Sequence, residues 1–326
     1  MACSLYSEKE YDVKIGIIGP GALGCLFASR LFLAASEQDK ILIIDHRSTR
    51  SDILNRQGIL YESGECHQRL PIPVSTNPTD IGTLDVIFSC VKSYDLEKSL
   101  TFIAPLLSPA SLLIFLQNGI NHLTYAHTLL QGIPVFGTTS EGATRLGPGH
   151  IRHAGSGHTS LGFLSQQSDT AKEHLEAVRT LLKKGAITTT ISNDIRSRIW
   201  AKLFINVGIN GLTAIHDESN GQLLKSTETQ DTLKGLVSEA IRVAISSGIP
   251  IDEDPVAATI TVCKNTADNI SSMLQDVRNH RPTEIDAING AISRIGLGFG
   301  VATPLNDKIT SQVKAMEKEY SEHSKS

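Results

Sequence analysis

The feature that most restricts the fold is a glycine triplet, Gly19-Pro20-Gly21-Ala22-Leu23-Gly24. The apolar run Val13–Ile18 precedes it and predicts a buried strand, whereas the amphipathic stretch Ala22–Ala35 follows it and predicts a helix. In such a turn the first glycine permits the sharp bend, the second lets the backbone approach a phosphate, and the third allows close packing of helix on strand. The pattern therefore predicts a dinucleotide site in which the helix N terminus binds the pyrophosphate.

Short apolar runs alternate with helical patterns through the first half of the chain. The runs predicted to be strands are Val13–Ile18, Ile41–Ile44, Val86–Cys90, Leu112–Leu116 and Val135–Gly137. Continuous apolar strands separated by helices are typical of a doubly wound parallel sheet. We therefore expect an α/β fold with a Rossmann-type domain over residues 1–192.

Helical patterns dominate from about residue 193 to the end. Two helices are predicted to start where a capping residue precedes a proline, at Asp254-Pro255 and at Thr303-Pro304. Gly248 and the glycines between Gly296 and Gly300 are predicted helix ends. We expect residues 193–326 to form an all-helical domain that carries the substrate-binding and catalytic residues.

Composition and charge exclude several functions. The 326 residues carry a net charge of -4, which gives no electrostatic basis for binding nucleic acid. No apolar run is long enough to span a membrane, and acidic residues precede the first apolar run, unlike an export signal. The five scattered cysteines form no C-x-x-C pair, so we predict free thiols, no metal site and a cytoplasmic location.

Residues after the second predicted strand point to both possible dinucleotides. Asp45 lies about twenty residues beyond the glycines, where an acid binds the ribose 2′-hydroxyl of NAD. Arg47 and Arg50 follow it and could instead pair with the 2′-phosphate of NADP. A solvated basic loop is the alternative for the two arginines.

A polar stripe interrupts the apolar segment Trp200–Asn210. Lys202, Asn206 and Asn210 recur at intervals of four, a spacing that places them on one face of a helix. Polar groups are costly to bury unless something binds them, although a stripe that faces solvent is the alternative. A desolvated lysine lowers its pKa readily, so Lys202 could act as a general acid near neutral pH.

Further candidates lie on both sides of this segment. Asn269 and Ser272 are one helical turn apart, and Glu284, which could also be a first-turn helix acid, could keep a nearby lysine protonated. Lys92 and Asn118 each follow a predicted strand, at the sheet edge where open α/β sheets bind ligands. The alternative for these two is an ordinary loop.

Several segments together resemble the ketopantoate reductase family. They are Ile199–Ile215, Asn269–Asp276, Thr283–Gly290, the glycine turn, Val91-Lys92, Gln117-Asn118-Gly119 and Gly137-Thr138-Thr139. The resemblance spans nearly the whole chain in the order of the family, and the segments of the second half are the most specific.

The resemblance implies reduction of 2-dehydropantoate to (R)-pantoate, a step of pantothenate biosynthesis, in a cleft between a Rossmann and a helical domain. Lys202 would protonate the keto oxygen. Glu284 and Asn206 would orient the substrate, Asn210 and Ser272 would bind its hydroxyl and carboxylate ends, and Asn269 would line the same site. Lys92 and Asn118 would line the cofactor and the reaction centre, with Glu284 contacting both ligands.

The resemblance also implies NADPH as the donor, because Arg47 matches the arginine that binds the 2′-phosphate. Asp45, and Asp95 where some members carry an amide, leave NAD open, and Asn121 departs from a loop that is often glycine-rich. Two other functions stay open: reduction of another branched or aromatic 2-keto acid, and a non-catalytic NAD(P) redox sensor. The expected partner is a small keto acid, and the protein could be a monomer or a homodimer.

Overall fold

The computed structural model describes residues 13–127 and 131–323, which divide into two compact units. The N-terminal unit comprises the described parts of Met1–Val91, Asp95–Leu116 and Thr128–Ile191. The C-terminal unit comprises those of Lys92–Tyr94, Gln117–His127 and Ser192–Ser326. Two short segments from the first half of the chain therefore belong with the helices of the second half.

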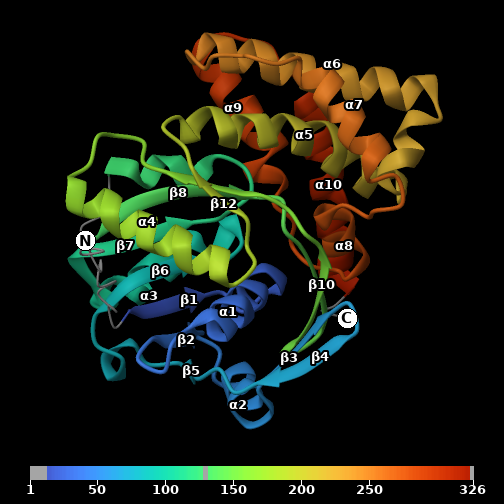
Figure 1. Cartoon of the computed structure of the whole chain (residues 1–326). Helices are drawn as coiled ribbons and strands as arrows, with labels where there is room; N and C mark the ends of the chain where they lie inside the picture. Colours follow the sequence, from blue (N-terminus) through green and yellow to red (C-terminus); the bar gives the residue numbers. More distant parts are fainter. Residues whose placement is uncertain (1–12, 128–130, 324–326) are drawn as a thin grey trace, which may run out of the picture. The chain divides into compact units, whose positions relative to one another are not determined.

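An eight-stranded sheet forms the centre of the N-terminal unit (Figure 1). Its strands, in spatial order, are β12 (Thr189–Ile191), β11 (Thr159–Gly162), β8 (Ile133–Thr139), β7 (Leu107–Phe115), β6 (Leu84–Ser89), β1 (Lys14–Ile18), β2 (Lys40–Ile44) and β5 (Val74–Ser75). Neighbours from β8 to β5 are all parallel, and only the β8–β11 pair is antiparallel. All five predicted strands lie in the parallel part, so the predicted α/β fold is confirmed.

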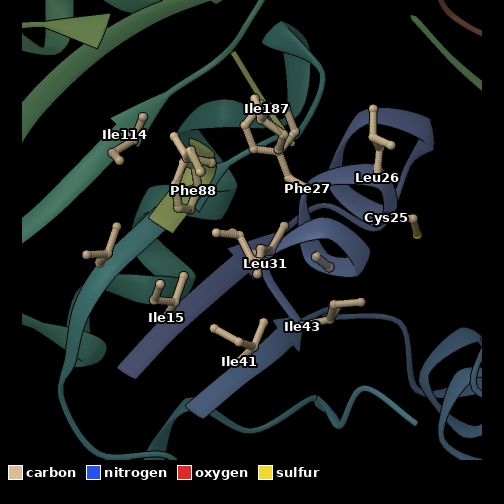
Figure 2. Close-up of a cluster of buried hydrophobic side chains, with 14 of the residues drawn as sticks. Ile15, Cys25, Leu26, Phe27, Leu31, Ile41, Ile43, Phe88, Ile114 and Ile187 are labelled. Carbon is tan, nitrogen blue, oxygen red and sulfur yellow. The ribbon is translucent and has the colours of Figure 1, made fainter. Parts of the chain in front are cut away.

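Helices α1 (Ala22–Ala34) and α4 (Asp169–Lys184) contribute side chains to one apolar core with this sheet. Figure 2 shows Phe27 and Leu31 of α1 facing the strand residues Phe88 and Ile15, and the rings of Phe27 and Phe88 lie 5.7 Å apart. These side chains are fully buried, as a sheet covered by helices requires. This core fixes the position of the turn between β1 and α1.

A second, four-stranded sheet was not predicted. Its order is β4 (Cys66–Leu70), β3 (Ile59–Ser63), β10 (His150–Gly155) and β9 (Gly142–Gly147). The remaining helices of this unit are α2 (Ser48–Gln57), α3 (Leu96–Ile103) and short 3₁₀ turns at Pro78–Asp80 and Ala104–Leu106.

The C-terminal unit is helical, which confirms the predicted class of the second half (Figure 1). Its helices are α5 (Ile195–His216), α6 (Thr227–Ser246), α7 (Pro255–Asn265), α8 (Ser272–Arg278), α9 (Asn289–Phe299) and α10 (Pro304–His323). Shorter 3₁₀ segments lie at Asn121–His127, Asn220–Leu224 and Ile285–Ala287, and one more begins at Ser93. Within residues 13–127 and 131–323, we find no helix with the length and apolar character needed to cross a lipid bilayer.

Local signals place most of these helix ends. The Asp254 carboxylate accepts hydrogen bonds from the backbone N–H groups of Val256 and Ala257, so α7 starts where predicted. Helix α10 also starts at its predicted proline. Helix α9 ends within the predicted range Gly296 to Gly300, because it continues to Phe299 and stops at Gly300 in the left-handed conformation.

Candidate active site

The glycine turn lies between β1 and α1, as predicted. Gly19 has φ +92°, a conformation that favours glycine, and a Cβ on Gly24 would lie only 2.1 Å from the carbonyl oxygen of Gly19. A Cβ on Gly21 would instead meet nothing within 4 Å, so the space in front of the helix is open. No side chain caps α1 and its first turn carries no acid, which leaves the positive end of the helix available to an anion.

These observations fit a dinucleotide pyrophosphate at the N terminus of α1. Pro20 is buried beside the turn, and Ala22 and Leu23 form the first turn of the helix. The six predicted residues from Gly19 to Gly24 are therefore placed as a phosphate-binding turn requires.

The structure links Asp45 to the arginines, although we expected the acid and the arginines to favour different dinucleotides. The Asp45 carboxylate, only 2% exposed, is bound by the Arg50 guanidinium through Nε and Nη2, and its Oδ1 also accepts from the backbone N–H of Arg47. The Arg47 side chain is exposed. Arg50 therefore pairs with the acid that we expected to compete with it.

In the C-terminal unit, α5 carries Lys202, Asn206 and Asn210 along one face, as their spacing predicts. Asn210 is buried, whereas Lys202 and Asn206 are partly exposed. The helix is packed closely, because a Cβ on Gly211 would lie 2.3 Å from the Ile309 side chain of α10. Close packing holds the polar stripe in a fixed position.

A hydrogen-bonded network joins the Lys202 ammonium to Glu284 through Asn118. Lys202 Nζ donates to Asn118 Oδ1 at 2.9 Å, and Asn118 Nδ2 donates to Glu284 Oε2 at 2.9 Å. Glu284 also accepts from the backbone N–H of Ser93 at 3.0 Å and from Lys92 Nζ at 3.3 Å. The structure thus brings together four predicted site residues from four separate parts of the chain: Lys92, Asn118, Lys202 and Glu284.

Asp276 is a member of this network that sequence analysis missed. Its Oδ2 accepts from Lys92 Nζ at 2.7 Å, so Lys92 lies between two carboxylates. His122, three residues after Gly119 and 1% exposed, was missed as well. Burial lowers its pKa to about 4, with Glu284 opposing and Lys202 adding to the shift, so the ring is neutral at neutral pH.

The pKa values of the charged groups in this network are shifted in different directions. Burial lowers the pKa of Lys202 to about 8, and the negative charge of Glu284 opposes this shift. Burial would raise the pKa of Glu284, but Lys92, Asn118 and Ser93 together hold it below its ordinary value. Burial would likewise lower the pKa of Lys92, yet the two carboxylates raise it. Lys202 is therefore the lysine that can release a proton near neutral pH, while Lys92 stays charged.

Four of the five predicted substrate residues, Asn206, Asn210, Asn269 and Ser272, are not partners in these hydrogen bonds. Asn269 is exposed in the segment before α8, and Ser272 is exposed at the first position of that helix. Ser272 lies one turn before Asp276, which places both on the same face of α8. The substrate roles of Asn206, Asn210, Asn269 and Ser272 stay predictions.

Comparisons with known proteins agree with this geometry. Residues 15–166 match the family described as ketopantoate reductase PanE/ApbA, and residues 194–317 match its C-terminal part. A 2-dehydropantoate 2-reductase from Halobacterium salinarum is 29% identical over 312 residues, covering 94% of this chain and 100% of the relative. One from Vibrio cholerae is 29% identical over 314 residues, covering 95% and 99%.

Solved structures give the same result. The ternary complex of D-mandelate dehydrogenase with NADH and anilino(oxo)acetate is 28% identical, with a TM-score of 0.86 over 95% of this chain and 99% of that one. A ketopantoate reductase from Ralstonia eutropha JMP134 is 24% identical with a TM-score of 0.85 over 95% and 100%, which shows the shared fold. Because both halves of the sequence match one family in its own order, the chain belongs to the ketopantoate reductase family of oxidoreductases.

Proposed function

We propose that this protein reduces 2-dehydropantoate to pantoate with NADPH as the donor. The observation that carries the proposal is the Lys202 ammonium, which hydrogen bonds to Asn118 and whose pKa burial lowers to about 8. An ammonium with such a pKa holds its proton at neutral pH yet can release it to an oxyanion. This is the group that reduction of a carbonyl needs, since negative charge develops on the oxygen as hydride reaches the carbon.

The chain supplies position and charge, and the bound nicotinamide supplies the hydride. Lys202 donates a hydrogen bond to the keto oxygen and then transfers its proton there. Asn118 holds the lysine through its amide oxygen, and Glu284 holds the amide through its nitrogen. Glu284 also keeps Lys202 protonated, because its negative charge raises the pKa of the lysine against the effect of burial.

The remaining predicted residues select the substrate. Asn206 and Asn210 follow Lys202 at one and two turns along α5, so their amides can bind groups on the same side of the substrate as the keto oxygen. Ketopantoate carries a hydroxyl in addition to its keto acid group, and amides can both donate to and accept from a hydroxyl. We assign the hydroxyl and carboxylate to Asn210 and Ser272, with Asn206 and Asn269 lining the site.

A second candidate is an NADH-dependent reductase of an aromatic 2-keto acid. D-Mandelate dehydrogenase, whose solved complex contains NADH, is 28% identical to this chain. The two candidates differ in the substrate hydroxyl, because a site built to bind a hydroxyl discriminates against substrates without one.

The test is oxidation of NADPH and of NADH, followed by absorbance, with three substrates: ketopantoate, 2-ketoisovalerate and benzoylformate. Ketopantoate should give the largest kcat/KM, and Asn210→Ala should reduce that advantage over 2-ketoisovalerate. A larger kcat/KM for benzoylformate with NADH than for ketopantoate with NADPH would favour the second candidate, and equal efficiency on ketopantoate and 2-ketoisovalerate would contradict binding of the substrate hydroxyl. Cofactor binding without oxidation of either cofactor would instead indicate a redox sensor.

A further inference from the structure

The carboxylate of Asp45 lies at the edge of the sheet next to the glycine turn. Strands β1 and β2 pair in parallel with Ile18 opposite Ile44, and the backbone N–H of Asp45 donates to the carbonyl of Ser75. The backbone on both sides of the acid is therefore fixed. In a fold of this kind, the residue at this strand end faces the ribose that carries the 2′ substituent.

Arg50 neutralises this acid. Its Nη2 donates to Asp45 Oδ1 at 2.6 Å and its Nε donates to Oδ2, a bidentate arrangement that uses both carboxylate oxygens. The Arg50 side chain is 22% exposed and that of Asp45 only 1%. An ion pair so shielded from water is screened less by salt than one on the surface.

Two basic side chains, those of His46 and Arg47, directly follow Asp45 in the sequence. The Arg47 side chain is exposed, and the exposed His46 ring lies 3.9 Å from Asp45 Oδ1. The thiol of Cys25, whose pKa burial raises to about 12, is influenced by Arg50 and Arg145 more strongly than by Asp45. The charges of Asp45 and Arg50 cancel each other. The Arg47 guanidinium therefore adds a net positive charge beside this ion pair.

We propose that Arg50 is the residue that determines which dinucleotide this protein binds: by pairing with Asp45, it lets a chain with an acid at this position accept the 2′-phosphate of NADPH. This rests on the proposed function, because it assumes that a dinucleotide binds at the glycine turn. Without Arg50, the negative charge of Asp45 would repel the 2′-phosphate of NADPH, and its carboxylate would accept a hydrogen bond from the 2′-hydroxyl of NADH. With Arg50, Arg47 is free to bind the phosphate.

The test measures dissociation constants for NADPH and NADH by fluorescence titration, without substrate. Arg50→Met keeps the aliphatic stem and removes the charge. It should weaken NADPH binding by about tenfold or more, because an uncompensated charge would then face a phosphate within a few ångström. NADH binding should stay within about threefold of the wild-type value, so the preference shifts toward NADH. Arg56→Met, at an exposed site on the same helix, is the matched control and should change neither constant.

Removing the acid should reverse the effect. Asp45→Asn in the Arg50→Met background should restore most of the lost NADPH affinity, and Asp45→Asn alone should increase the preference for NADPH. The single variant keeps an oxygen for the Arg47 N–H, so the proposal remains testable if Arg50→Met does not fold.

Two results would overturn the proposal alone: equal weakening of both cofactors by Arg50→Met, or no recovery in the double variant. A wild-type protein that prefers NADH would overturn it together with NADPH as the proposed donor. Failure of the proposed reductase activity looks different. It would appear as no binding of either dinucleotide to the wild-type protein, or as binding of NADPH without reduction of any keto acid.

Discussion

Replacing Glu284 with glutamine tests how the network sets the acidity of Lys202. One amide separates the two charges, with hydrogen bonds of 2.9 Å on each side, so they lie roughly 6 Å apart. At that separation, the carboxylate stabilises the ammonium by about 0.7 kcal/mol with water-like screening and about 2.8 kcal/mol at an effective dielectric constant of 20. Since 1.36 kcal/mol corresponds to one pH unit, removing the charge should move the titration of Lys202 by about 0.5 to 2 pH units.

The direction follows from the sign of the lost charge. An anion favours the protonated lysine, so its removal lowers the pKa and the acid is lost at lower pH. In the wild-type protein, kcat/KM for reduction should fall as pH rises through about 8, where Lys202 loses its proton. In Glu284→Gln, the fall should begin about 0.5 to 2 pH units lower.

The assay is kcat/KM for ketopantoate with saturating NADPH, measured from weakly acidic to alkaline pH. Comparing the pH at which the rate falls separates the electrostatic effect from any loss of rate at the plateau. Glu228→Gln, on the exposed first turn of α6, is the control and should leave the profile unchanged. A profile for Glu284→Gln that keeps its midpoint, or moves toward alkaline pH, would refute the assignment of Lys202 as the acid held protonated by Glu284.

Three further variants test other parts of the site. Lys202→Met should reduce kcat by about 10²- to 10⁴-fold. The same variant should melt at a higher temperature at pH 7. The pKa of Lys202 is lowered from 10.5 to about 8, so below pH 8 the folded state bears the cost of a partly buried charge, about 1 to 3 kcal/mol, which the apolar methionine side chain removes. Lys264→Met, at an exposed position in the last turn of α7, is the control, and a lower melting temperature of Lys202→Met would contradict the reasoning. Asp276→Asn should leave cofactor binding unchanged but reduce kcat by about tenfold, because Lys92 then pairs with Glu284 alone. The exposed Asp268→Asn is the control and should leave kcat unchanged. An unchanged kcat for Asp276→Asn would remove Asp276 from the network. Gly21→Ala should fold normally yet weaken NADPH binding at least about tenfold, because its Cβ meets no protein atom but would occupy the space proposed for the phosphate. A variant with the melting temperature and the NADPH affinity of the wild-type protein would show that the phosphate lies elsewhere.

The sequence predicted those elements of the fold whose periodicity is visible in neighbouring residues. The glycine turn, α1 and the polar stripe of α5 were predicted because strand and helix periods are written directly in neighbouring residues. The second sheet was missed because β4 is exposed and polar for most of its length, so it has no apolar alternation. Gly64, at φ +58° between β3 and β4, was the available hairpin signal.

The network itself could be predicted only in part. The rule for strand ends indicated Lys92 and Asn118, and the family resemblance indicated Glu284, but no local spacing links Lys92 to Asp276, which is 184 residues away. The Asp45–Arg50 pair illustrates the same limit at shorter range. Both residues were identified, yet their ion pair depends on the turn into α2, which the sequence pattern does not specify.

The missed residue Asp276 explains how one network can hold two lysines in different states. Lys92 has two carboxylates within ion-pair distance, and the shorter contact is to Asp276. Burial raises the pKa of Asp276, and Glu284 adds to that effect, so this acid depends on the charge of Lys92 to stay ionised. Because Asp276 shares the charge of Lys92, Glu284 is not fully neutralised and retains an influence on Lys202 through Asn118. Lys202, which is held through the amide oxygen of Asn118, keeps the lowered pKa of about 8 that the proposed proton donor requires.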